Sequence, residues 1–158
     1  MRRREILAGA VTLPAMLAQQ ADWKPLTLSA NQNETIITIS DLLIPATDTP
    51  GAKAANVNRY IDLLLADGDA KQRTTFLHGL AKLDTFTAQS HGKPFRSCTV
   101  DQQKAILKQA LDGTAPKAAA DFVRSAKAMT SRIYYNTEIG EQELNKGGRV
   151  PKSFACNA

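Results

Sequence analysis

The side chains that most often carry catalysis or metal binding are few in this chain. It has two histidines, His78 and His91, and neither has a Cys, Asp or Glu at a metal-ligand spacing such as i, i+4. His78 lies among apolar residues of a predicted helix, so we expect a structural role rather than a ligand. His91 precedes a glycine in a predicted loop, and we expect it to be solvated.

Acidic residues and glycines give no clearer chemistry. Asp62, Asp67 and Asp69 are close in sequence but lack the full spacing of a calcium loop, and their positions look exposed, which does not favour acid–base catalysis. The pair Gly147-Gly148 follows no predicted strand and opens no predicted helix, so it is not a nucleotide-binding turn. We therefore expect no catalytic, cofactor-binding or metal-binding residue on this chain.

Two cysteines, Cys98 and Cys156, are the candidates for a disulfide bond. Outside the cytoplasm thiols tend to pair, and an even count suits one bond that would tie the C-terminal tail to the middle of the chain. Two free thiols and a disulfide to a partner chain are the alternatives. No CxxC or CxxCH motif occurs, so zinc and covalent haem have no support.

The N-terminus has the pattern of an export signal. Arg3 and Arg4 are followed by Ile6 and Leu7, and an apolar run continues over residues 6–17. That run is too short for a membrane span, which takes about 20 apolar residues. A basic segment before a short apolar run is typical of a secretory signal. The arginine pair indicates the twin-arginine route, which exports folded proteins.

Two simpler interpretations of this start stay open. The arginines could belong to an ordinary signal or to the first turn of an amphipathic helix. The cleavage pattern does not decide the fate of the segment, because no stretch supplies small residues at both required positions. Cleavage after Ala18, cleavage after Ala21 and retention as an anchor are the alternatives. We assign residues 1–21 to the signal and residues 22–158 to a single domain.

Composition favours a small helical domain. The chain has 158 residues, only 6% aromatic residues and many Ala, Leu, Lys and Gln residues. Its formal charge of +5 is mild, and no basic cluster with interleaved aromatic residues occurs, so nucleic-acid binding has little support.

Apolar periodicity predicts about five helices and no confident strand. Their expected ranges are residues 30–44, 56–67, 69–89, 100–112 and 117–135, and the tail over 136–158 looks irregular. Ser29 with Gln32 and Thr99 with Gln102 have the form of capping boxes. In the second helix Val57, Tyr60, Ile61, Leu64 and Leu65 follow the i, i+3, i+4, i+7, i+8 pattern of a buried face. The fold class is therefore all-α, a small bundle with an N-terminal signal segment and an irregular C-terminal tail.

Residues 44–52, with the sequence IPATDTPGA, separate the first two helices. Pro45 stops the first helix, and Pro50, Gly51 and the side chains that cap turns predict a stiff, ordered loop. On physical grounds alone, a simple connector between helices is the preferred interpretation. Tyr134, Tyr135 and Phe154 in the C-terminal region are suited either to an interface or to the core.

These residues resemble subunit 3, the small or gamma subunit, of the gluconate 2-dehydrogenase type of sugar and sugar-acid dehydrogenases. The resemblance rests on the arginine-pair start, on the IPATDTPGA stretch, on residues 58–62 and 76–80, and on residues 134–140 with Glu143 and Leu144. It runs from the signal to about Leu144. After Leu144 the chain departs from the usual Gly-aromatic pair of relatives.

The resemblance implies a division of labour. A large GMC-type flavoprotein binds FAD and oxidises the sugar, and a multihaem cytochrome c, carrying haem c, passes electrons to the membrane. The small subunit carries no cofactor; it keeps the flavoprotein folded and supplies its twin-arginine signal. The complex would then lie in the periplasm, at the outer face of the inner membrane.

The resemblance also suggests which residues to single out. Arg3, Arg4, Ile6 and Leu7 would direct export, and the partner interface would use Pro45, Asp48, Pro50 and Gly51, with Tyr134, Tyr135 and Glu138 as further candidates. A stand-alone periplasmic helical binding protein is the main alternative. An enzyme that acts through His78 or His91 is a more distant one.

Overall fold

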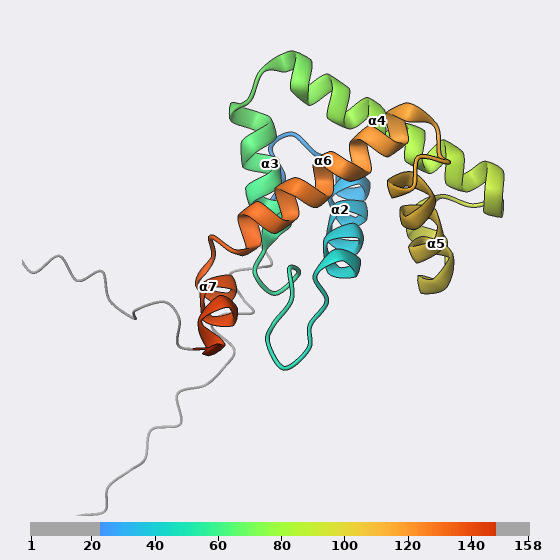
Figure 1. Ribbon diagram of the computed structural model, residues 1–158. Coiled ribbons are helices and arrows are strands. Elements are labelled where there is room, and N and C mark those ends of the chain that lie inside the picture. Colours follow the sequence, from blue (N-terminus) through green and yellow to red (C-terminus); the bar gives the residue numbers. More distant parts are fainter. Residues whose placement is uncertain (1–22, 148–158) are drawn as a thin grey trace, which may run out of the picture.

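The computed structural model describes residues 23–147, and all regular structure in that range is helical (Figure 1). In chain order the elements are α2 (Ala30–Leu43), α3 (Val57–Asp67), α4 (Ala70–His91), η1 (Phe95–Ser97), α5 (Val100–Leu111), α6 (Lys117–Tyr134), α7 (Glu138–Leu144) and η2 (Asn145–Gly147). No strand occurs among these described residues. The predicted all-α class is confirmed, and the five predicted helices agree with α2 to α6 to within a few residues.

Local sequence explains where these helices begin. Both predicted capping boxes are present: the Ser29 and Thr99 hydroxyls accept hydrogen bonds from the backbone N–H groups of Gln32 and Gln102, whose side chains accept in return from the cap residues. The β-branched run 35–39 lies within α2, so the amphipathic spacing outweighs β-propensity there.

Helix α6 lies at the centre of the fold and packs against α2, α3, α4 and α5 (Figure 1). Its closest neighbour is α4, and the two helices meet at Gly79. A Cβ atom on Gly79 would lie 2.5 Å from the Cβ of Phe122, so only glycine allows this approach. The buried core then forms around α6; its largest fully buried side chains include Tyr134, Phe95, Ile36, Ile39, Ile61, Leu80, Leu83 and Ile106.

The structure differs from the prediction in the C-terminal tail, because residues 138–144 form α7. Thr137 caps this helix: its hydroxyl accepts a hydrogen bond from the N–H of Gly140 at 3.2 Å. Gly140 packs so closely on the Tyr134 carbonyl that a Cβ atom would overlap it. A polar helix of seven residues has too few apolar positions for sequence periodicity to reveal it. A helix this short is stabilised mainly by tertiary contacts such as this one.

A second difference concerns the apolar face predicted for α3. Val57, Ile61 and Leu65 are buried as expected, but Tyr60 is 49% exposed and Leu64 is 52% exposed. The chain itself therefore covers only part of the predicted face. Within the described residues, no helix is long and apolar enough to cross a membrane.

Candidate functional site

The buried face of α3 includes a carboxylate that sequence analysis placed at an exposed position. Asp62 is fully buried, and its oxygens accept hydrogen bonds from the backbone N–H groups of Leu26, Thr27 and Leu28 at 2.6, 3.0 and 2.8 Å. These bonds fix the segment that leads into α2 against α3. The prediction that Asp62 is exposed is wrong. Position 62 is not among the apolar positions predicted to form the buried face of this helix, so no local pattern marked it as buried.

One further contact holds this N-terminal segment on α3, and a second joins α2 to the same helix. The guanidinium of Arg59 lies over the Trp23 ring, 5.3 Å from its centroid. In the same helix, the Asn58 amide donates to the Asn33 side-chain oxygen at 2.9 Å and so joins α3 to α2. The path of the chain from Trp23 to α2 is therefore set by side chains of α3.

The loop between α2 and α3 closes on itself at its base. The N–H of Ala52 donates to the Ile44 carbonyl at 2.9 Å, and the N–H of Thr47 donates to the Thr49 carbonyl at 2.9 Å. Gly51 is buried between these chain segments, and a Cβ atom there would lie 2.5 Å from the Ile44 carbonyl oxygen. The loop is thus an ordered turn whose closure requires glycine at position 51.

Tyr134, the last residue of α6, fastens this loop from the inside. Its side chain is fully buried, and its hydroxyl oxygen lies 2.8 Å from the Pro50 carbonyl and 2.6 Å from a carboxylate oxygen of Glu143. The phenol has one proton, so it donates to one of these acceptors at a time. Burial, followed by the hydrogen bond to Glu143, raises the pKa of Tyr134 to about 12.

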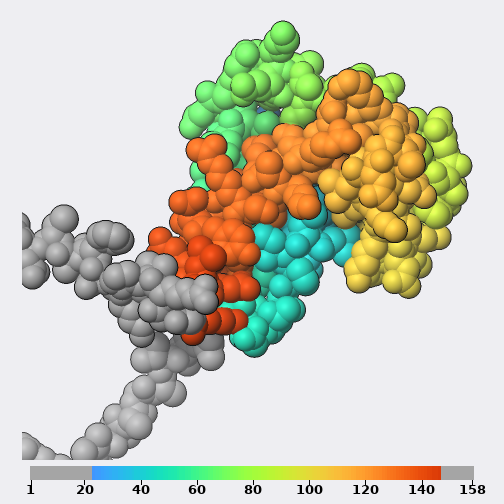
Figure 2. Space-filling model, viewed as in Figure 1, coloured from blue at the N-terminus to red at the C-terminus, as the bar shows by residue number. Residues whose placement is uncertain are grey.

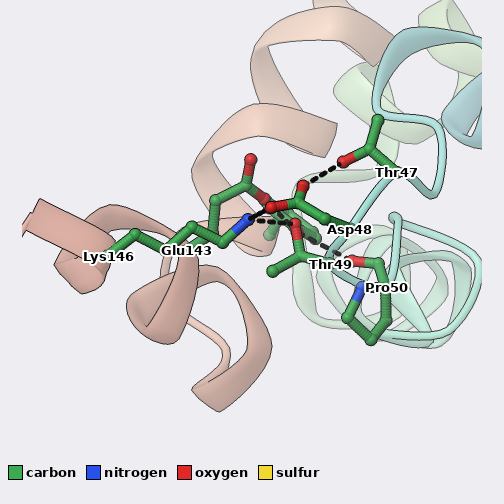
Figure 3. A network of polar contacts seen from close by, with 7 residues as sticks. Thr47, Asp48, Thr49, Pro50, Glu143 and Lys146 are labelled. Carbon is green, nitrogen blue, oxygen red and sulfur yellow. Dashed lines mark hydrogen bonds and ion pairs between the residues drawn. The ribbon is translucent and has the colours of Figure 1, made fainter.

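Lys146 completes the contact between the loop and the C-terminal segment (Figure 3). Its ammonium donates to the Asp48 carboxylate at 2.7 Å and to the Thr49 hydroxyl at 3.3 Å. The hydrogen bond from Lys146 is the main reason why the pKa of Asp48 lies below its usual value, and a bond from the Thr47 hydroxyl adds to it. We call Tyr134, Glu143 and Lys146 the loop clamp.

The loop clamp is built to hold a shape rather than to react. At neutral pH the Tyr134 phenol keeps its proton, as an ordinary tyrosine does, and its raised pKa extends this to higher pH, so it acts as a hydrogen-bond donor. Within residues 23–147, no group of three His, Cys, Asp or Glu side chains lies close enough together to hold a metal ion. What the arrangement can do is present an exposed loop in one fixed conformation.

A family model describes the fold that carries this loop. The model for gluconate 2-dehydrogenase subunit 3 matches residues 30–147. The chain belongs to the gluconate 2-dehydrogenase subunit 3 family. No match to the chain was found among curated proteins or among solved structures. The suggested resemblance is thereby confirmed, and the matched range extends past Leu144 to the end of η2.

The residues predicted to form the partner interface are partly exposed and partly buried. Pro45, Asp48 and Pro50 are exposed on the loop, whereas Gly51 and Tyr134 are buried. Tyr134 can therefore influence a partner only through the loop that it holds. Tyr135 and Glu138 are exposed just beyond α6, and the Tyr135 ring packs edge-on against that of Tyr134. Sequence analysis missed Glu143 and Lys146 as members of this site. Lys146 bonds to loop residues about a hundred positions earlier in the chain, and Glu143 bonds to Tyr134 of α6.

Other predicted residues stand apart from the loop. Cys98 is buried, and its thiol lies 3.6 Å from the Pro94 carbonyl. Its predicted partner Cys156 lies outside the described residues, as do Arg3, Arg4, Ile6 and Leu7, so the disulfide and the export signal stay predictions. His91 is partly exposed and ends α4, where a loop was predicted; His78 is exposed on α4, so it does not form part of the core.

His78 instead lines a groove on the surface of the subunit. The groove has a volume of about 940 Å³ and lies between the C-terminal half of α3, the N-terminal half of α4, and α6. In the space-filling view, α3 and α4 (green) meet α6 (orange) on this side of the molecule (Figure 2). The groove and the exposed part of the loop are two features of the described residues that face outward.

Proposed function

We propose that the chain is the non-catalytic small subunit of a periplasmic FAD-dependent sugar or sugar-acid dehydrogenase complex. The observation that carries the proposal is the family match over residues 30–147. This range contains every described helix from α2 to η2, so the similarity covers the folded unit rather than one motif.

In the proposed complex, a large GMC-type subunit binds FAD and oxidises the sugar, and a multihaem cytochrome c carries electrons to the membrane. The small subunit keeps the large one folded and supplies its export signal. Arg3 and Arg4, followed by Ile6 and Leu7, support the twin-arginine route. This route suits a partner that must fold around FAD before it crosses the membrane, and it would leave the complex at the outer face of the inner membrane.

The exposed part of the loop is a candidate contact with the large subunit. Pro45, Asp48 and Pro50 are exposed, and the backbone beneath them is held by hydrogen bonds and by the buried Tyr134. A surface that is already ordered loses little conformational freedom on binding, which favours association. Tyr135 directly follows the helix that fastens the loop, and Glu138 begins α7; both are exposed and would extend the same contact.

The proposal is tested by replacing Arg3 and Arg4 together with lysine in the full-length chain. We expect the flavoprotein and its dehydrogenase activity to stay in the cytoplasm, because the twin-arginine machinery distinguishes arginine from lysine although both are basic. The matched control is Arg2→Lys, which keeps the pair and should leave export unchanged. Measurement is by FAD fluorescence and activity in separated periplasmic and cytoplasmic fractions.

A deletion strain separates the folding role from the export role. Without the small subunit, we expect the flavoprotein to be insoluble or to lack FAD in the cytoplasm. An active, exported flavoprotein in that strain would overturn the proposal.

A further inference from the structure

Helix α3 has apolar side chains on its exposed surface as well as on the face that the rest of the chain buries. Val57, Ile61 and Leu65 bury the inner face of α3, yet Tyr60, Leu63 and Leu64 remain 49%, 42% and 52% exposed on the same helix. A surface helix normally turns charged or polar residues outward. Three large apolar side chains within five consecutive residues form a patch of the kind that marks an interaction site.

The patch continues into the groove between α3, α4 and α6. Leu64 forms part of the groove wall, and the floor is apolar: the buried rings of Phe76 and Phe122 pack edge to face with centroids 4.9 Å apart. Met129 of α6, which packs against the core, also lines the groove. Apolar side chains entering between α4 and α6 would therefore find aromatic and thioether partners.

Charges around the groove favour an acidic occupant. Four cationic and two acidic residues line it: Lys71, Arg73, Lys117 and Arg132 against Asp67 and Asp121. Arg73 is engaged with carbonyl groups at the end of α3, and Lys117 forms an ion pair with Asp121. Lys71 and Arg132 have no ion pair within residues 23–147, so they can receive carboxylates from a partner.

The same surroundings argue against a small polar ligand. Sites for such ligands aim a few polar groups into the pocket to fix orientation. The uncharged polar side chains that line this groove, among them Gln72, Thr75 and Ser125, are exposed rather than buried within it. The groove also runs on into the exposed face of α3, which extends the apolar surface beyond what one small molecule would cover.

We propose that this surface, the groove together with Tyr60, Leu63 and Leu64, is a docking site for the large subunit of the complex. Its occupant is an apolar segment of that subunit, flanked by carboxylates that pair with Lys71 and Arg132. The inference rests on the proposed function, since it assumes a larger subunit, and it adds a surface separate from the exposed loop.

The test places a charge in the apolar contact. The full-length chain with Leu64→Asp is co-produced with the FAD-containing subunit, purified through a tag on the small subunit, and assayed for bound FAD per small subunit. We expect the FAD recovered per small subunit to fall about tenfold or more, because the new carboxylate would be desolvated without a partner and would weaken association. The matched control is Val100→Asp at the start of α5, since Val100 is 54% exposed and lies away from the groove.

A second variant guards against a folding artefact. Leu64 is half exposed, so helical content measured by circular dichroism should not change. If the helical content changes, the double variant Lys71→Glu with Arg132→Glu is used in place of Leu64→Asp. The double variant should also lower bound FAD, because it reverses the charge offered to the partner without touching the core.

The outcomes separate this inference from the proposed function. Wild-type chain that captures no FAD-containing subunit would contradict the proposed function itself. Normal capture by the charge variants alongside normal wild-type capture would overturn only the docking surface. If Leu64→Asp instead converts a wild-type dimer of the small subunit to monomers while flavoprotein capture is unchanged, the surface joins two copies of this chain and the proposal is wrong.

Discussion

The hydroxyl oxygen of Tyr134 lies 2.8 Å from the carbonyl oxygen of Pro50, although the two residues are 84 positions apart in the chain. The last turn of α6 therefore fixes the loop between α2 and α3. Tyr134 also contacts Glu143 of α7, so one buried phenol joins three parts of the fold. The conformation of the exposed loop residues that are interface candidates therefore depends on the contact between Tyr134 and Pro50.

Replacing Tyr134 with Phe should lower the free energy of unfolding by about 1 kcal/mol, because the partly buried hydrogen bond that the phenol shares between Pro50 and Glu143 is lost. Denaturant unfolding measures the change. Tyr135→Phe is the matched control: its hydroxyl makes no hydrogen bond within the described residues, and its removal should have little effect. Equal effects of the two substitutions would contradict the assigned role of Tyr134.

Alkaline pH should weaken the fold through the same residue. The pKa of Tyr134 is raised to about 12 in the folded chain from a usual value of 10.0. The folded state therefore holds the proton more tightly, and the stability that this provides is complete below about pH 10 and is lost as pH rises towards 12. Unfolding midpoints measured across this range should fall, and Tyr134→Phe should show a smaller fall than wild type.

Asp62→Asn should loosen the N-terminal segment. The amide keeps one oxygen acceptor but loses the charge and the second acceptor that serve three backbone N–H groups, and we expect a loss of about 2–4 kcal/mol. Hydrogen exchange at Leu26, Thr27 and Leu28 should accelerate, which NMR would detect. Asp67→Asn, at the exposed end of α3, is the control and should leave these amides protected.

Gly51→Ala should disturb the closure of the loop. The added Cβ would meet backbone atoms of Ile44, Pro45 and Ala46 at 2.5–2.7 Å, and backbone cannot turn aside as a side chain can. We expect a cost of about 1–3 kcal/mol, typical of overpacking. The neighbouring exposed Pro50→Ala should cost less than about 1 kcal/mol, because the carbonyl that accepts from Tyr134 is kept. A thermal melt of both variants distinguishes these outcomes.

Local chemistry explains the parts of the fold that sequence predicts well. The capping boxes at Ser29 and Thr99 involve residues three positions apart, so they are visible in the sequence and are present in the structure. The inner face of α6, with Phe122, Ala126 and Ile133 buried, follows helical periodicity in the same way.

Features that depend on distant partners were missed or misjudged. Asp62 looked exposed because its hydrogen-bond donors lie 34 to 36 residues earlier in the chain. The position of α7 depends on contact with Tyr134, which no local pattern reveals. The helical periodicity places Tyr60 and Leu64 on the same apolar face as the buried residues of α3. Periodicity does not show whether the surface that covers an apolar side chain belongs to the same chain.

The attachment of the N-terminal segment to Asp62 has a mechanical consequence. A pull on the chain from the N-terminal side of Trp23 would first stress the Trp23–Arg59 contact and then the three hydrogen bonds to Asp62. Both anchors belong to α3, the helix that also carries Tyr60, Leu63 and Leu64. Tension applied there would therefore reach the helix that carries the proposed docking surface directly, without passing through the core around α6.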